Sequence, residues 1–156
     1  MEAGAIDDPY FGRNSVKAQW VQHYEWWYAA QFYVTEDVKN KYIRLEFDGV
    51  DYSCDVWLNG HYLGRHDGAF EKFNFEVTDY LRIGKDARRG ANMLTVKLNP
   101  PTHINTELGG LKTPWFGDYW RDLIPFGIWR PVRLVTSGNG FKDRRCLCPY
   151  QDRQEL

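Results

Sequence analysis

Hydrophobic and polar residues alternate with a period of two over much of the chain. The alternation is found in residues 26–34, 42–48, 53–58, 72–77, 94–98 and 132–134. Because successive side chains of a β-strand point to opposite faces, each segment predicts a strand with one apolar face. Residues 78–81 predict a single helical turn, and no longer segment shows the 3.6-residue period of a helix. The pattern indicates an all-β protein.

The segment 53–58 ends in the strongest turn signal of the chain. Asn59-Gly60 follows it directly, and both residue types tolerate positive φ, so a tight hairpin is predicted that fixes the register of the two flanking strands. Trp57 lies on the polar face of this strand, where we expect it to pack under a loop or against a neighbouring domain. Short strands separated by turns imply an antiparallel β-sandwich in one domain.

One long segment, residues 99–127, interrupts the alternation. It contains four prolines together with Trp115, Phe116, Tyr119, Trp120 and Phe126. Loops of this length are uncommon in compact domains and are usually functional or disordered. Disordered segments are poor in aromatic residues, so we expect this one to be ordered against another surface.

Composition and charge exclude several classes of function. The net charge is −1, from 20 basic and 21 acidic residues that are mixed along the chain, so nucleic acid is not an expected partner. No apolar run approaches the ~20 residues of a membrane helix, and a soluble domain is expected. The first residues lack the features of a signal peptide. Cytoplasm, periplasm and secretion all remain open.

Cysteine and histidine give no sign of a metal site. Cys54 lies in an apolar strand and is interpreted as a small buried hydrophobe, and Cys146 and Cys148 share one face of a late strand. Three free thiols are the expected state, and the four histidines are scattered. No cofactor is indicated, and a structural calcium ion is left open.

Two motifs resemble a known family. Residues 47–81, FDGVDYSCDVWLNGHYLGRHDGAFEKFNFEVTDYL, and residues 127–135, GIWRPVRLV, resemble the N-terminal sugar-binding domain of glycoside hydrolase family 2. The segments IDDPYFGRN and WWYAAQFYV are most similar to its β-mannosidase and exo-glucosaminidase branches. The resemblance spans residues 6–149. It implies a galactose-binding-domain-like jelly roll that is not an enzyme on its own.

The resemblance also sets the expected domain limits. Residues 1–143 are expected to form the jelly roll, and residues 144–156 to begin a linker to a following domain, with Arg144 and Arg145 where the family has apolar residues. In such enzymes a second sandwich and a barrel with two catalytic glutamates follow. The implied parent is a retaining exo-glycosidase of the β-mannosidase or β-galactosidase type, whose two carboxylates lie about 5–5.5 Å apart.

The segment 115–122, WFGDYWRD, carries the sharpest candidate site. Indole rings stack on the C–H faces of sugars, and a carboxylate accepts two hydroxyl hydrogens at once. The resemblance implies that this loop reaches the active site of the parent enzyme, where the mannosidase sequence resembles FGWDWG. Here the acid is shifted by one position, so either Asp118, which we favour, or Asp122 takes its place. The candidates are Trp115, Asp118, Tyr119, Trp120 and Asp122. The alternative is that these side chains only cover one end of the sandwich.

Three further residues are weaker candidates. Trp26 and Trp27 are adjacent, so one of them must face away from the core. The outward ring is either a second sugar platform or, as we expect, packed against loop residues. Arg130 either clamps a carboxylate of the loop or, as we expect, makes a structural ion pair.

The expected function is non-catalytic carbohydrate binding, with a mannoside, glucosaminide or galactoside as ligand. Binding is expected to be weak, or to complete the active-site rim of the parent barrel. A structural docking domain with no ligand of its own and a free-standing lectin-like adhesion module are the alternatives. Uncovered aromatic residues of the long loop would make the isolated chain self-associate.

Overall fold

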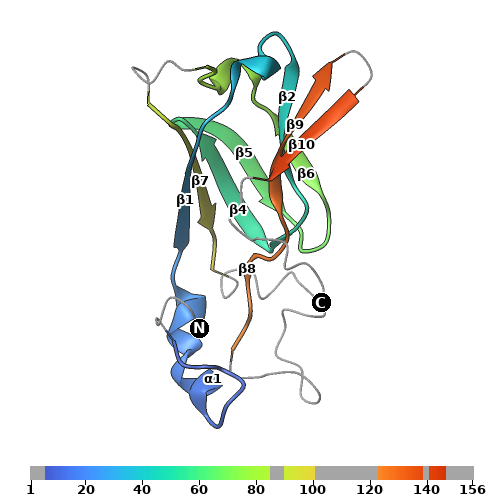
Figure 1. The fold of residues 1–156 in the computed structure, drawn as a ribbon. Helices are drawn as coiled ribbons and strands as arrows, with labels where there is room; N and C mark the ends of the chain where they lie inside the picture. Colours follow the sequence, from blue (N-terminus) through green and yellow to red (C-terminus); the bar gives the residue numbers. More distant parts are fainter. Residues whose placement is uncertain (1–5, 85–89, 101–122, 139–140, 147–156) are drawn as a thin grey trace, which may run out of the picture.

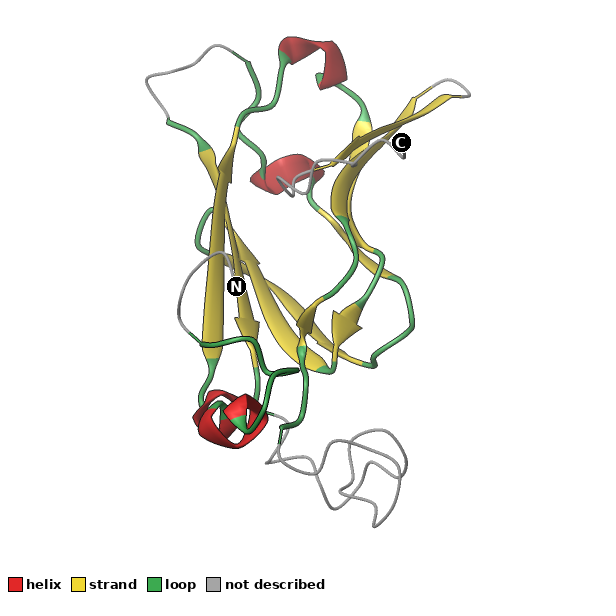
Figure 2. Ribbon diagram, turned by 60° about the horizontal axis from the view of Figure 1, so that its bottom comes forward, coloured by secondary structure: helices red, strands yellow, loops and turns green. Residues whose placement is uncertain are grey.

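The chain folds into two antiparallel sheets that face each other, which confirms the predicted sandwich of the jelly-roll class (Figures 1 and 2). The computed structural model describes residues 6–84, 90–100, 123–138 and 141–146. Each sheet has four strands, and two short strands form a ribbon that continues the pairing of β2 (Tyr42–Phe47) with β9 (Val132–Gly138). Within the described residues, no helix has both the length and the apolar character needed to cross a membrane.

Strands distant in sequence are neighbours in both sheets. The first sheet has the order β1 (Trp26–Phe32), β7 (Asn92–Leu98), β4 (Ser53–Leu58) and β5 (His61–Asp67). The second has the order β10 (Phe141–Cys146), β9 (Val132–Gly138), β2 (Tyr42–Phe47) and β6 (Phe73–Glu76). The ribbon pairs β3 (Val50–Asp51) with β8 (Gly127–Ile128). β10 runs through the limit expected after residue 143 and continues its pairing with β9 to Cys146.

The helical elements are short. They are α1 (Asn14–Lys17) and the 3-10 turns η1 (Gln19–His23), η2 (Glu36–Val38) and η3 (Thr78–Tyr80). The turn predicted at residues 78–81 is confirmed as η3. The pair α1 and η1 was not expected from the sequence, because elements of four or five residues are too short to display a helical period. This pair lies just beyond the end of the first sheet at which β1 begins (Figure 1).

The core is formed by the apolar faces that the alternation predicted. Ile43, Leu45 and Phe47 of β2 have no exposed surface, and the inward residues of β4 and β7 complete the cluster. Phe47 stacks flat on Phe73, with ring centres 4.6 Å apart. Cys54 is part of this cluster, as predicted, and burial raises the pKa of its thiol to about 12. The thiol is therefore protonated at neutral pH.

The Asn59-Gly60 hairpin is present, and three hydrogen bonds of the Asn59 side chain hold it. Both residues have positive φ, 52° and 85°, and Leu58 pairs with His61 across the turn. The Asn59 amide donates to the backbone oxygen of Tyr80 and to the side-chain oxygen of Asn92, and its own oxygen accepts from Met93 N. The turn is thereby tied to η3 and to β7.

A bulge in β5 follows the hairpin. Trp57 pairs with Tyr62 while Val56 pairs with Gly64, so Leu63 is an extra residue in β5. Leu63 packs against the core, and Gly64 lies so close to Phe75 that a Cβ atom would be 2.8 Å from its ring. Two consecutive residues of β5 thus approach the second sheet, as a bulge permits.

We expect Gly64→Ala to lower the free energy of unfolding by about 3 kcal/mol, because an added methyl group meets the Phe75 ring at a φ of +147°. The matched control is Gly60→Ala, which has a φ of +85° but no atom within 4 Å of the new Cβ. The control should lose only the free energy of unfolding that a positive φ costs a residue with a Cβ atom, about 1–2 kcal/mol. Urea unfolding measures both, and equal losses would show that the contact with Phe75 has no cost.

Candidate functional site

The end of the sandwich near α1 contains the flanks of the aromatic-rich segment. Residues Trp115, Asp118, Tyr119, Trp120 and Asp122 themselves lie outside the described residues. Leu98, at the end of β7, and Phe126, just before β8, line the same pocket. Ile124 N donates to the side chain of Gln22 in η1, at 2.8 Å. The chain therefore leaves the first sheet and returns to the ribbon at one end of the molecule.

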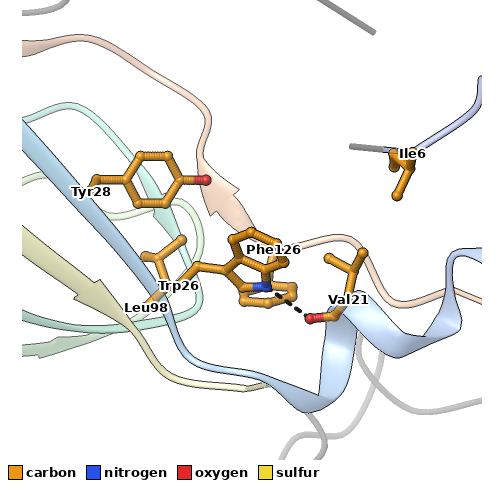
Figure 3. A pocket seen from close by; sticks show the side chains of 6 residues that line it. All are labelled: Ile6, Val21, Trp26, Tyr28, Leu98 and Phe126. Carbon is orange, nitrogen blue, oxygen red and sulfur yellow. Dashed lines mark hydrogen bonds between the residues drawn. The ribbon is translucent and has the colours of Figure 1, made fainter. Parts of the chain in front are cut away.

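The pocket at this end has a volume of about 160 Å³ and a largely apolar wall (Figure 3). Its lining residues are Ile6, Val21, Trp26, Tyr28, Leu98 and Phe126. Trp26 is half-buried, and its indole nitrogen donates to the backbone oxygen of Val21 at 2.9 Å. This bond holds the ring in the pocket wall.

Trp27 points away from the core, as expected for one of two adjacent tryptophans. Its side chain is 58% exposed, whereas Trp26 is partly buried against the core. Among the described residues its ring partner is Trp57 of β4, with centres 5.4 Å apart and planes 28° apart. Trp57 in turn contacts Tyr62 of β5 at 5.3 Å. We name Trp27, Trp57 and Tyr62 the aromatic row. The partner expected for an outward tryptophan was a loop residue, whereas here it is a residue of β4, which β7 separates from β1.

A set of polar groups runs beside the aromatic row. Lys97 Nζ lies 3.2 Å from the Asp55 carboxylate and 3.5 Å from that of Glu25. Asp55 also accepts hydrogen bonds from the Tyr62 hydroxyl at 2.9 Å and the Asn99 amide at 3.1 Å. The Tyr62 hydroxyl therefore links the aromatic row to these polar groups. We name Glu25, Lys97, Asp55 and Asn99 the polar row.

The environment of Asp55 favours its ionised form. Burial by itself raises the pKa of this carboxyl group, but the hydrogen bonds from Asn99 and Tyr62, together with Lys97, outweigh burial. The pKa is therefore below its ordinary value. At neutral pH the side chain is a carboxylate with both oxygens engaged, so the two rows are held in one geometry.

Arg130 lies at a different corner of the molecule. Its guanidinium carbon is 4.2 Å from the ring centre of Trp129, a cation–π arrangement. Trp129 donates its indole N–H to the backbone oxygen of Ala69 and meets Phe70 edge to face. The ion pairs found among the described residues do not include Arg130. The carboxylates of residues 115–122 lie outside the described residues, so the ion pair expected for Arg130 stays a prediction.

Part of this arrangement was readable from the sequence. A two-residue turn at Asn59-Gly60 places Trp57 opposite Tyr62, so the hairpin signal already contained that contact. The pairing of Lys97 with Asp55 was missed, because it requires β7 to lie beside β4. In the described part of the chain, no three His, Cys, Asp or Glu side chains gather closely enough to hold a metal ion.

A family model for the glycosyl hydrolase 2 galactose-binding domain-like domain matches residues 1–115. The chain belongs to this family. Its resemblance to the N-terminal domain of family 2 glycoside hydrolases is thereby confirmed.

Relatives of this family 2 domain include two mannosidases. A mannosylglycoprotein endo-β-mannosidase of Lilium longiflorum is 27% identical over 154 residues, which cover 85% of this chain and 16% of the relative. β-mannosidase A of Emericella nidulans is 31% identical over 159 residues, again 16% of that protein and 86% of this chain. The sequence thus spans about a sixth of the length of these relatives.

A solved structure has the same fold. The β-D-mannosidase of Dictyoglomus thermophilum matches with a TM-score of 0.67 and 25% identity, over 87% of this chain and 22% of that one. The matched portion is therefore one part of a much larger protein.

The lowered pKa of Asp55 predicts a contribution to acid sensitivity. Because the folded pKa lies below the unfolded value of about 3.9, the contribution is fully present above that pH and is lost as pH falls through the folded pKa. We expect Asp55→Asn to have a lower free energy of unfolding than the wild type at neutral pH, and to lose less of that free energy on acidification. Urea midpoints measured from about pH 6 to about pH 2.5 test this.

A second variant separates the hydrogen bond from the charge. Tyr62→Phe keeps the carboxylate and removes one donor, so the pKa of Asp55 should rise toward its unfolded value. The stability lost on acidification should then be smaller and should be complete at a higher pH than in the wild type. Parallel pH profiles for wild type and both variants would contradict this account of Asp55.

Proposed function

We propose that this chain is the non-catalytic carbohydrate-binding domain of a family 2 glycoside hydrolase. Its role is to bind sugar weakly or to complete the active-site rim of the parent exo-glycosidase. The observation that carries the proposal is the position of the described residues on either side of the segment 101–122. Its two flanks converge at one end of the sandwich, beside the pocket of Trp26 and Phe126.

Such an arrangement suits a domain that presents a loop to a partner. Functional residues are often carried by loops on a rigid scaffold, and here the strands β7 and β8 hold both flanks. The Ile124–Gln22 hydrogen bond ties the returning flank to η1. Both flanks of the segment are therefore anchored to the sandwich.

The chemistry of residues 115–122 suits a terminal sugar. Trp115, Tyr119 and Trp120 supply apolar faces for stacking, and Asp118 or Asp122 supplies a carboxylate for a pair of hydroxyls. The parent reaction would be retaining hydrolysis by two carboxylates about 5–5.5 Å apart, both outside this chain. A mannoside is the preferred substrate, ahead of a glucosaminide or galactoside, because the most similar matches include mannosidases.

The 156-residue chain should bind methyl β-mannoside in the millimolar range, equivalent to about 4 kcal/mol. We expect Trp120→Ala and Asp118→Ala each to weaken binding about tenfold, because each removes one of the main contacts. Calorimetry measures the affinities, with Phe70→Ala as the control at an exposed aromatic residue elsewhere. Unchanged binding in both variants would remove residues 115–122 from the site.

A structural docking domain is the competing function. Aromatic side chains near one end of the sandwich would then cover a neighbouring domain and bind no sugar. On this alternative the isolated chain self-associates, and Trp115→Ser or Trp120→Ser abolishes the association. Sedimentation velocity over a concentration series is the measurement. A monomer at every concentration, together with sugar binding, would exclude docking as the main role.

A free-standing lectin-like module is the third candidate. It predicts that the isolated chain binds glycans as strongly as any longer protein that contains it. Comparing the two on one glycan array separates this candidate from a rim that functions only beside a barrel.

A further inference from the structure

The outer face of the first sheet carries the aromatic row across its width. Trp27 lies on the edge strand β1, Trp57 on β4 and Tyr62 on the other edge strand β5. Trp27 and Tyr62 remain 58% and 55% exposed, although each contacts Trp57. The rings therefore form a continuous apolar surface that is open to solvent, whereas the core residues of the same strands lie on the opposite face.

The bulge in β5 is what keeps this surface complete. Leu63 and Gly64 both approach the core, so Tyr62 before them and Arg65 after them share the outer face. With regular alternation, Tyr62 and Arg65 would lie on opposite faces of β5. The bulge thus places Tyr62 and Arg65 on the same face of β5.

The charges beside the aromatic row nearly cancel. Glu25, Asp55 and Asp67 are acidic, and Lys97 and Arg65 are basic, and each basic group contacts a carboxylate. An anionic ligand would meet three carboxylates, and a cationic ligand would meet two basic groups already paired. A neutral ligand with many hydroxyl groups suits such a surface, because it uses donors and acceptors without requiring net charge.

Accessible donors and acceptors are present on this face. The side chains of Glu25 and Arg65 are about half exposed, at 50% and 51%, next to the stacking rings. Asp55 and Lys97 are mostly covered and hold the Tyr62 hydroxyl and the Glu25 carboxylate in place. Polar groups beside apolar ring faces are the combination that recognises pyranose rings.

We propose that the outer face of the first sheet is a second carbohydrate-binding surface, which takes a neutral glycan chain laid across strands β1, β7, β4 and β5. Trp27 and Tyr62 would stack on sugar rings, and Glu25 and Arg65 would bind hydroxyl groups. The site is separate from residues 115–122. Successive ring centres in the row are 5.4 and 5.3 Å apart, so the row is longer than one ring and offers contacts to more than one sugar unit.

The test titrates the full 156-residue chain with methyl β-mannoside and with β-1,4-linked mannohexaose, cellohexaose and galactohexaose. We expect at least one hexasaccharide to bind about tenfold more tightly than the monosaccharide. The indole N–H resonance of Trp27 should shift during that titration. Because the ligand is neutral, raising NaCl to about 0.5 M should leave the affinity within about twofold.

Variants locate the binding. Trp27→Ala should weaken hexasaccharide binding about tenfold, and Trp27→Phe should restore most of it, because a flat ring is retained. Tyr42→Ala, at a 45% exposed tyrosine of the second sheet, is the matched control and should bind as wild type. Circular dichroism confirms that the Trp27 variants are folded, as expected for a largely exposed side chain.

Three results would overturn the proposal. The first is no binding of any of the three hexasaccharides, and the second is binding that is the same in wild type and Trp27→Ala. The third is self-association lost in Trp27→Ala without glycan binding, which would make this face an interface between two copies. Trp120→Ala and Asp118→Ala act on monosaccharide binding. The sugar-binding role proposed for residues 115–122 is therefore tested independently of the outer face.

Discussion

The register of β4 against β5 and β7 is the constraint on which both faces of the first sheet depend. Side chains alternate between the faces, so a slip of one residue would exchange the core side chains of β4 for Asp55 and Trp57. Two features oppose such a slip. The Asn59-Gly60 turn sets the pairing with β5, and the Asn59 side chain bonds to Met93 N on β7. One short turn therefore positions three strands.

The two faces of this sheet have different physical roles. The inner face buries Val56, Leu58 and Val96 and closes against the second sheet, whereas the outer face holds stacked rings and paired charges. The inner face also contains one buried polar side chain of β7 whose hydrogen bonds are made. Asn92 is buried in β7, and its amide exchanges hydrogen bonds with both backbone groups of Arg82. A buried polar residue with its partners in place supports the strand without disturbing the core.

Local patterns predicted the strands, the inward residues and the hairpin, because each depends on neighbours in sequence. The outward position of one of Trp26 and Trp27 followed from the same alternation. The bulge at Leu63 was not predicted, and it brings Gly64 against Phe75 of the other sheet, a contact between distant residues that alternation does not encode. The Lys97–Asp55 contact also depends on strand order, which alternation does not encode. For residues 115–122 the sequence supplies candidate chemistry, and their arrangement lies outside the described residues.

Because the two faces of the first sheet are separate, the sequence of the outer face can change while the core stays the same. Replacing Trp27 or Tyr62 removes exposed surface and creates no cavity, so the loss of stability should be small compared with a change at Phe47. Mutations on the outer face therefore cost the domain little of the stability that folding requires. Proteins with the same core can therefore differ in the chemistry of this face, one exposed side chain at a time.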